Sequence, residues 1–434
     1  MASSGRNISA AAALEDSTAR YIRHNPESLR RFEENRRSMP GGNTRTVIFY
    51  DPFPVMLKKG EAQHLWDVDG HRYTDFLGEY SAGLYGHSNP VLKAAAFEAI
   101  EGGMVLGGPN GYEGQLASLI CQRFPSCERV RFCNSGTEAG LMALGTARSA
   151  TGRSHIMAFE GAYHGGVLSF GKGNVANVPF PTVLGRYNDI ASTLERIEAH
   201  ANELAAIIVE PMMGSGGAIP GDAEFLQALR DAATRHGIVL IFDEVMTSRL
   251  SPGGLQAKLG ITPDLTTFGK YLGGGFSFGA FGGRADLMDR LDPSRPNSIS
   301  HAGTFNNNVA SMAAGLAGLR DVFTPEAAVT LNEQGERFRA RINETARARG
   351  IRMQATGVGS IISLHFNDQP IRSPQDVDPA PELRSLIHLE MMERGFYFAR
   401  RGYMSLSLCL APEDFDGFIA AYDDFIQSYE SLLT

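Results

Sequence analysis

Apolar and polar stretches alternate regularly through the middle of the chain. The six residues Gly237 to Phe242 carry no charge, and Ala205 to Val209 form a second uncharged run. Runs of this length are typical of strands that are buried on both faces of a mostly parallel sheet. Strand patterns alternate with helical patterns and glycine loops over residues 71–325. This alternation predicts an α/β fold whose central sheet is largely doubly wound.

The two ends of the chain follow a different pattern. Asp16 to Arg37 is predicted to be helical with charged faces, and a break at 40–42 leads to extended segments at 46–50 and 64–67. After Pro325, the pattern predicts a long helix, a strand at 360–366 and a helical tail. We therefore expect an N-terminal arm at 1–70, a large domain at 71–325 and a C-terminal block at 326–434. The arm and the C-terminal block together would form a smaller α+β domain.

Two residues that follow predicted strands are candidates for catalysis. Asp243 comes directly after Phe242, where a parallel strand would end, and ligands of open α/β sheets bind outside that edge. Asp264 is the competing carboxylate, but it precedes the next strand. Asp243 is therefore our candidate for holding a proton on a pyridine nitrogen, and Lys270 for the Schiff base of pyridoxal phosphate. Such a lysine must be neutral, and burial lowers an amine pKa. Taken alone, such an aspartate is more often a helix cap and such a lysine more often a surface residue.

A phosphate site is predicted at the start of the next helix pattern. Ser135 can cap that helix, and Gly136 allows an anion to approach free backbone N–H groups. The alternative is an ordinary capping box of Ser135 with Glu138. In a separate glycine loop, Tyr163 and His164 offer an aromatic face that can stack on a flat ring, although such a pair often serves only for packing.

These segments, taken in order, resemble one enzyme family. The motifs are Asn134–Ala139, Gly161–Gly165, Val209–Pro211, Asp243–Thr247, Thr267–Gly275 and Gly303–Thr304. Together they resemble the class III aminotransferases, which have fold type I, and the match runs from about Met39 to Leu408. Met246–Thr247 is similar to the glutamate-1-semialdehyde aminomutases, but Phe305–Asn308 and Ser248–Arg249 depart from their pattern. In these details the chain is most similar to the bacterial β-phenylalanine aminotransferases.

The resemblance implies a role for each matching residue. Lys270 would be the Schiff-base lysine, Asp243 the partner of the pyridine nitrogen, and Val245 the apolar contact on the ring face opposite Tyr163. Ser135, Gly136 and Thr137 would hold the phosphate, and His164, Glu210 and Met246 would lie beside the cofactor. Thr304 would reach the phosphate of the neighbouring subunit, so the smallest competent unit would be a homodimer.

Substrate recognition calls for carboxylate receptors, and arginine provides bidentate ones. Arg45 follows the break at 40–42, and Arg401 precedes Gly402. In the resembling enzymes, the matching arginines bind carboxylates on the two sides of the site. Surface arginines are the alternative. Aromatic residues in the N-terminal region would line an apolar pocket or belong to the core: Phe49, Tyr50, Phe53, Tyr80 and Tyr85. We select Tyr80 as the substrate contact.

The composition of the chain argues against several classes of partner and site. The 434 residues are 43% apolar and 20% charged, enough for two domains, and the formal charge of −8 argues against nucleic-acid or anionic-membrane partners. No apolar run is long enough for a membrane span, the N-terminus does not resemble a signal peptide, and the four cysteines lack metal-site spacing. We expect a cytoplasmic enzyme without a metal.

The sequence therefore predicts a ping-pong aminotransferase that takes the amino group of an aromatic β-amino acid or related amine. The acceptor would be 2-oxoglutarate or pyruvate. The alternatives are a 2,1-aminomutase, which moves nitrogen within one molecule, and an amine:pyruvate transaminase without a preference for β-amino acids. A racemase of the same fold, or an inactive relative that only binds the cofactor, would show no net amino transfer.

Overall fold

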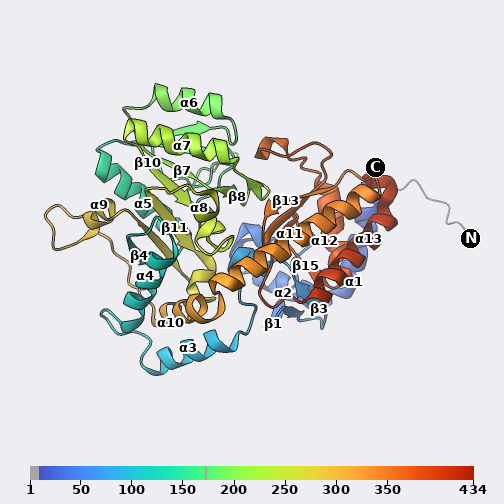
Figure 1. Ribbon diagram of the computed structural model, residues 1–434. Helices are drawn as coiled ribbons and strands as arrows, with labels where there is room; N and C mark the ends of the chain where they lie inside the picture. The colour runs from blue at the N-terminus through green and yellow to red at the C-terminus, as the bar shows by residue number, and fades with distance from the viewer. Residues whose placement is uncertain (1–8, 172–173) are drawn as a thin grey trace, which may run out of the picture.

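The computed structural model describes residues 9–171 and 174–434 and has two lobes (Figure 1). The larger lobe contains a seven-stranded sheet. Its strands, in spatial order, are β4 (Arg129–Cys133), β12 (Gly279–Gly283), β11 (Leu265–Gly269), β10 (Val239–Asp243), β7 (Leu204–Val209), β5 (His155–Phe159) and β6 (Thr182–Gly185). Strand β12 runs antiparallel to both of its neighbours, β11 and β4, and the other neighbouring pairs of this sheet are parallel. The predicted mostly parallel sheet is present.

Both faces of this sheet are covered, which explains why its strands are apolar throughout. In β10, Leu240 and Phe242 pack into one buried cluster, whereas Ile241 packs into the other. Helix α7 (Ala223–His236) contributes to the first cluster and α5 (Gly136–Thr151) to the second. Because successive side chains of a strand point to opposite faces, two covered faces require an uninterrupted apolar run.

The smaller lobe combines both ends of the chain. It has a four-stranded sheet of β1 (Leu57–Glu61), β2 (His64–Asp67), β3 (Arg72–Asp75) and β15 (Phe396–Tyr397). A second sheet contains β13 (Gln354–Val358), β14 (Ile361–His365) and β16 (Tyr403–Ser405). The accompanying helices are α1 (Ala10–His24), α2 (Pro26–Asn35), α11 (Pro325–Ala348), α12 (Pro381–Glu393) and α13 (Pro412–Leu433). The parallel pair β3–β15 and the ion pairs of Arg20 with Glu390 and Glu393 join the two ends.

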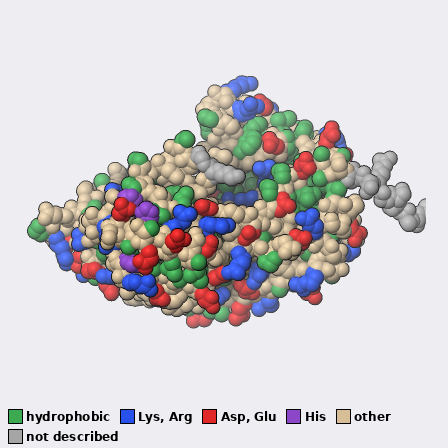
Figure 2. Space-filling view, turned by 90° about the horizontal axis from the view of Figure 1, so that it is seen from above, with side chains coloured by type: hydrophobic (Ala, Val, Ile, Leu, Met, Phe, Trp, Pro, Cys, Tyr) green, Lys and Arg blue, Asp and Glu red, His purple; other side chains and the backbone are tan. Residues whose placement is uncertain are grey.

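The remaining elements lie mostly around the larger sheet. They are α3 (Pro90–Glu101), α4 (Gly111–Arg123), α6 (Ile190–Ala199), α8 (Gly254–Leu259), α9 (Ala285–Met288), α10 (Val309–Ala317) and the hairpin of β8 (Met212–Met213) and β9 (Ile219–Pro220). When the molecule is viewed from above, its surface has a hollow near the middle, and Lys or Arg side chains lie inside this hollow (Figure 2). Within the two described ranges, no helix is long and apolar enough to cross a bilayer.

Several local predictions differ from the structure. The segment 16–37 is two helices, because Pro26 starts α2 and removes the N–H that a continuous helix needs. The extended conformation predicted for 46–50 is wrong at Thr46–Ile48, which form a 3-10 turn. The central strand begins at Val239, since Gly237 ends α7 with a φ of 63°.

Of the two interpretations given for the N-terminal aromatic residues, pocket wall or core, the structure shows core for most of them. Tyr50 and Phe53 are buried in the cluster of the N-terminal arm, and Tyr85 is buried in the largest cluster. Phe49 stays partly exposed, at 38%. Tyr50 and Phe53 attach the arm to the smaller lobe, since their cluster includes Leu389 and Met392 of α12.

Candidate active site

A cavity of about 440 Å³ lies at the carboxyl edge of the larger sheet. Asp243 is the last residue of β10, Lys270 follows β11, and α5 begins at the same edge. The cavity is lined by Arg45, Thr46, Val47, Tyr80, Gly136, Thr137, Tyr163, His164, Gly165, Glu210, Met212, Ser215, Asp243, Val245, Met246, Lys270 and Arg401. The fold thus brings most of the predicted site residues to one place.

Asp243 is held by three hydrogen-bond partners. Its Oδ2 lies 2.7 Å from Nδ1 of His164, and its Oδ1 accepts the hydroxyl of Thr267 at 3.0 Å and the N–H of Val245 at 3.1 Å. Burial alone would lower the pKa of His164, but the hydrogen bond and charge of Asp243 outweigh it and raise that pKa. The Asp243 side chain is therefore fixed in position by His164, Thr267 and Val245. Asp264 instead pairs with Arg230 and Arg284 and does not line the cavity.

The neighbouring acid has a different function. Glu244 is fully buried and accepts the backbone N–H groups of Leu255 and Gln256 at 2.7 and 2.9 Å, together with the hydroxyl of Thr247. Its carboxylate ties the start of α8 to the end of β10. Of the Asp-Glu pair, only Asp243 faces the cavity.

Lys270 has the properties of a reactive amine. Burial lowers its pKa to about 8, Arg45 and Arg401 act in the same direction, and Glu79 and Asp243 oppose them. Its backbone is left-handed, with a φ of 58°, a conformation that non-glycine residues adopt rarely. Such a lysine is partly neutral near neutral pH and can attack a carbonyl carbon.

The start of α5 forms an anion cradle with Gly165. A Cβ on Gly136 would lie 2.9 Å from the side chain of Val245, and a Cβ on Gly165 would overlap Thr137. The hydroxyl of Thr137 accepts the N–H of Gly166 at 3.3 Å. Ser135 caps the helix by accepting the N–H of Glu138 at 3.1 Å, and it does not line the cavity. The helix N-terminus favours a phosphate at this point.

Glu210 and Tyr163 form the opposite wall. Glu210 accepts the N–H groups of Tyr163 and Gly214 at 3.0 and 2.8 Å, and burial raises its pKa to about 7. Tyr163 is 46% exposed, which leaves its ring available to a ligand. Nε2 of His164 is buried without a hydrogen-bond partner among the described residues. An aromatic, phosphorylated cofactor fits these features.

Both predicted arginines line the cavity. Arg401 lies over the rings of Tyr80 and Tyr403, at 5.4 and 5.3 Å, whereas Arg400 bonds to the hydroxyl of Ser385 outside it. Arg45 pairs with Glu79 at 2.6 Å.

The sequence predicts that Thr304 acts in the site of a partner subunit, and some residues that line the cavity were not predicted. Thr304 is exposed and does not line the cavity of its own chain. Met212, Ser215 and Val47 line the cavity but carried no motif that would select them. The two short segments that supply Met212 and Ser215 follow Glu210, so their proximity to a predicted site residue was the available signal.

Known proteins resemble the whole chain. The family model for aminotransferase class-III matches residues 49–412. The chain belongs to the class III aminotransferases. The β-phenylalanine transaminase of Variovorax paradoxus is 52% identical, with 97% of each chain covered, and the crystal structure of that organism's β-phenylalanine aminotransferase superposes with a TM-score of 0.97 over 98% of this chain and 99% of that one.

Two further relatives are more distant. An ω-transaminase structure from Sphaerobacter thermophilus is 35% identical with a TM-score of 0.87, and the alignment covers 93% of this chain and 98% of that one. The glutamate-1-semialdehyde 2,1-aminomutase of Bordetella avium is 38% identical over 88% of this chain and 94% of its own. The fold type I prediction is confirmed, and this class III aminotransferase depends on pyridoxal phosphate.

Proposed function

We propose that this aminotransferase transfers the amino group of an aromatic β-amino acid, such as β-phenylalanine, or of a related amine, to 2-oxoglutarate or pyruvate. The observation that carries the proposal is the pair of arginines, Arg45 and Arg401, in the cavity that contains Lys270. The likeness to the Variovorax enzyme, which is named for β-phenylalanine, supports the same substrate class.

Each chemical role in the proposal belongs to a residue of the cavity. Bound pyridoxal phosphate supplies a ring that accepts the electron pair left when a proton leaves the substrate carbon. Lys270 accepts and returns that proton as a neutral amine, and Asp243, fixed by His164 and Thr267, keeps the ring nitrogen protonated. Tyr163 would contact one face of the bound ring and Val245 the other.

The same proposal assigns the cofactor phosphate. Gly136 and Thr137 hold it with backbone N–H groups and a hydroxyl at the start of α5, while Ser135 keeps that helix end in place. Glu210 and Met246 lie beside the ring. His164 acts through Asp243 and is a positioning residue in this respect.

We further propose a homodimer in which Thr304 of the partner subunit completes the phosphate site. Thr304 is exposed and lies outside the cavity of its own chain, which favours a role in the partner's site. Large apolar side chains are exposed on neighbouring segments: Phe97, Met104, Val105, Leu106, Phe276 and Phe305. Exposed apolar groups of this kind mark interfaces. The cysteines are free thiols, which is consistent with the proposed cytoplasmic location.

The two arginines allow two substrates to use one site in turn. A β-amino acid carries its carboxylate one carbon further from the amine than an α-amino acid does. Arg45 binds that carboxylate in our proposal, and Arg401 binds the carboxylate of the oxo acid. Tyr80 lies under Arg401, and its hydroxyl donates to the carbonyl of Val47 at 2.9 Å, so it forms part of the wall between the two receptors.

The test is an amino-transfer assay with the purified, cofactor-loaded enzyme. β-Phenylalanine is mixed with 2-oxoglutarate or pyruvate, and glutamate or alanine is measured, with 1-phenylethylamine and L-alanine as alternative donors. We expect transfer from β-phenylalanine. Transfer from 1-phenylethylamine alone would leave the aminotransferase assignment and remove the β-amino acid assignment. An aminomutase would isomerise a single substrate without an acceptor.

A further inference from the structure

The two arginines of the cavity differ in their charge partners. Nη2 of Arg45 lies 2.6 Å from Oε1 of Glu79, and about half of each side chain is exposed. Arg401 contacts aromatic rings, its Nε is buried without a hydrogen-bond partner, and no carboxylate in residues 9–171 or 174–434 pairs with it. One receptor is therefore occupied by a carboxylate of the protein itself, and the other is open.

An unusual backbone holds Glu79 beside Arg45. Glu79, Tyr80 and Ser81 have φ values of 44°, 53° and 79°, three left-handed non-glycine residues in succession. Residues other than glycine rarely adopt this conformation, and where they do near a site, the surrounding structure must enforce it. Without such contacts the backbone would not adopt this conformation, and Glu79 would not lie beside Arg45.

Contacts on three sides enforce this turn. Oδ1 of Asp75 accepts the N–H groups of Leu77 and Gly78 at 2.8 and 3.1 Å, and a Cβ on Gly78 would overlap the carbonyl of Ser405. The hydroxyl of Tyr80 donates to Val47, two residues after Arg45. The turn thus connects the two receptors: Glu79 pairs with Arg45, and Tyr80 lies under Arg401.

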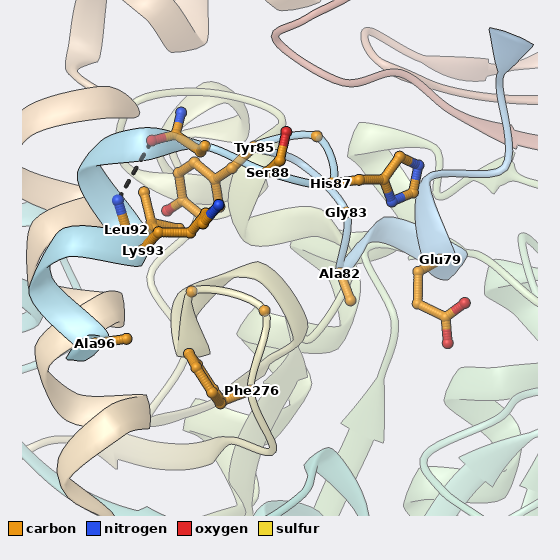
Figure 3. A pocket seen from close by; sticks show the side chains of 14 residues that line it. Glu79, Ala82, Gly83, Tyr85, His87, Ser88, Leu92, Lys93, Ala96 and Phe276 are labelled. Carbon is orange, nitrogen blue, oxygen red and sulfur yellow. Dashed lines mark hydrogen bonds between the residues drawn. The ribbon is translucent and has the colours of Figure 1, made fainter. Parts of the chain in front are cut away.

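Glu79 also has space into which it can withdraw. It forms part of the wall of a second cavity, of about 300 Å³, to which His87 and Lys93 contribute (Figure 3). Nε2 of His87 lies 2.9 Å from Asp75, and Lys93 is exposed. Because the Glu79 side chain is half-exposed, a carboxylate released from Arg45 stays hydrated, and the Arg45–Glu79 pair can open without burying an unpaired charge.

We propose that Glu79 is a specificity-determining residue, which occupies Arg45 when no substrate carboxylate is bound there and which that carboxylate displaces. The inference rests on the proposed role of Arg45. It explains how one cavity accepts substrates with and without a carboxylate. For a carboxylate-free amine, Glu79 balances the charge of Arg45. For a β-amino acid, binding includes the loss of the Arg45–Glu79 pair, so Glu79 weakens the affinity for carboxylates.

The test measures how tightly the cofactor-loaded enzyme binds 3-phenylpropionate, which has the β-phenylalanine skeleton without the amine. Binding is measured by calorimetry and by inhibition of amino transfer. Glu79→Gln keeps the shape and removes the charge. Glu344→Gln removes the same charge at an exposed position of α11 and is the matched control. We expect Glu79→Gln to bind the probe about two- to fivefold more tightly, within the range for an exposed ion pair, and Glu344→Gln to bind it like the parent. The KM for 1-phenylethylamine as an amino donor should not fall in Glu79→Gln.

The variants separate the inference from the function on which it rests. If Arg45→Ala weakens the probe while Glu79→Gln leaves it unchanged or weakens it, the displacement idea is wrong and the role of Arg45 stands. If Arg45→Ala has no effect, the proposed role of Arg45 fails first. In the Arg45→Ala background, Glu79→Gln should change nothing, and a gain there would overturn the inference. Glu79→Asn, which suits a left-handed backbone, repeats the test if the Gln variant does not fold.

Discussion

Nδ1 of His164 lies 2.7 Å from Oδ2 of Asp243, and both side chains are buried at the edge of the larger sheet. The two residues are far apart in sequence and come together because β10 ends beside the loop that follows β5. A buried carboxylate needs such partners to remain charged. The pair thus holds the Asp243 carboxyl in a fixed orientation where a cofactor ring nitrogen would meet it.

This relationship predicts an order of activity among His164 variants. His164→Asn keeps a neutral donor near Asp243, whereas His164→Phe removes both donor and charge. Because a charged hydrogen bond contributes about 1.5–3 kcal/mol and a neutral one about 0.5–1.5, we expect kcat/KM to fall roughly tenfold or more for Phe and only a few-fold for Asn. Steady-state kinetics with β-phenylalanine or another accepted donor measures this order. Equal losses in the two variants would mean that the imidazole matters only for packing.

Lys270 should determine the pH dependence of covalent cofactor loading. Its pKa is lowered, so the neutral amine that attacks the cofactor aldehyde predominates above pH about 8 and is lost below it. The rate at which the cofactor-free protein takes up pyridoxal phosphate covalently should therefore rise with pH and level off above about 8. An ordinary lysine would still be gaining rate at pH 9.

Variants of the charged residues near Lys270 test whether charge sets its pKa. Arg45 and Arg401 lower this pKa and Glu79 raises it, so Arg45→Ala should move the inflection to higher pH and Glu79→Gln to lower pH. Stopped-flow absorbance follows the loading, and Lys270→Ala serves as the blank. Shifts in the reverse direction would show that these side chains do not act on Lys270 through charge. Lys270→Ala should also abolish transamination.

The sequence predicts those features of the site that depend on neighbouring residues, and it does not predict those that depend on contacts between distant segments. Asp243 and Lys270 were predictable because an apolar run locates the edge of a parallel sheet, and a carboxylate or a lysine just beyond it lies at that edge. The pairing of His164 with Asp243 needed the strand order. The left-handed turn at Glu79–Ser81 contradicts local preferences and exists only through contacts with Asp75, Val47 and Ser405. No pattern in the sequence indicates it.

Arg249 offers a test of the contact between the two lobes. It is fully buried and donates to the hydroxyls of Ser360 and Ser405 at 3.1 and 2.9 Å and to the carbonyl of Leu406, and burial lowers its pKa to about 10. Arg249→Met would leave these acceptors unsatisfied, at a cost of about 1–3 kcal/mol in the free energy of unfolding. Arg249→Lys would be worse, because it keeps a buried charge with fewer donors in place. Urea denaturation measures the free energy of unfolding of both variants. A Lys variant that is as stable as the Met variant would contradict this prediction.

His388 should make the protein lose stability in mild acid. Its ring lies 4.5 Å from that of Tyr50, and neither nitrogen makes a hydrogen bond of good geometry among the described residues. Burial lowers its pKa to about 3, the charge of Arg400 acts in the same direction, and an interaction with the backbone of Phe398 does not offset them. The folded protein therefore keeps His388 neutral at a pH where the unfolded chain, with a pKa of about 6.5, binds a proton.

The sign of the effect follows from that difference in proton binding. The unfolded state binds more protons between pH about 6.5 and 3, so the free energy of unfolding falls as the pH falls through this window, by about 2 kcal/mol at pH 5 from this residue alone. His388→Leu removes the titrating group and should flatten this part of the profile. Denaturant midpoints of parent and variant at pH 5, 6 and 7 give the difference directly. A gap between parent and variant that is the same at all three pH values would show that His388 acts by packing and not by titration.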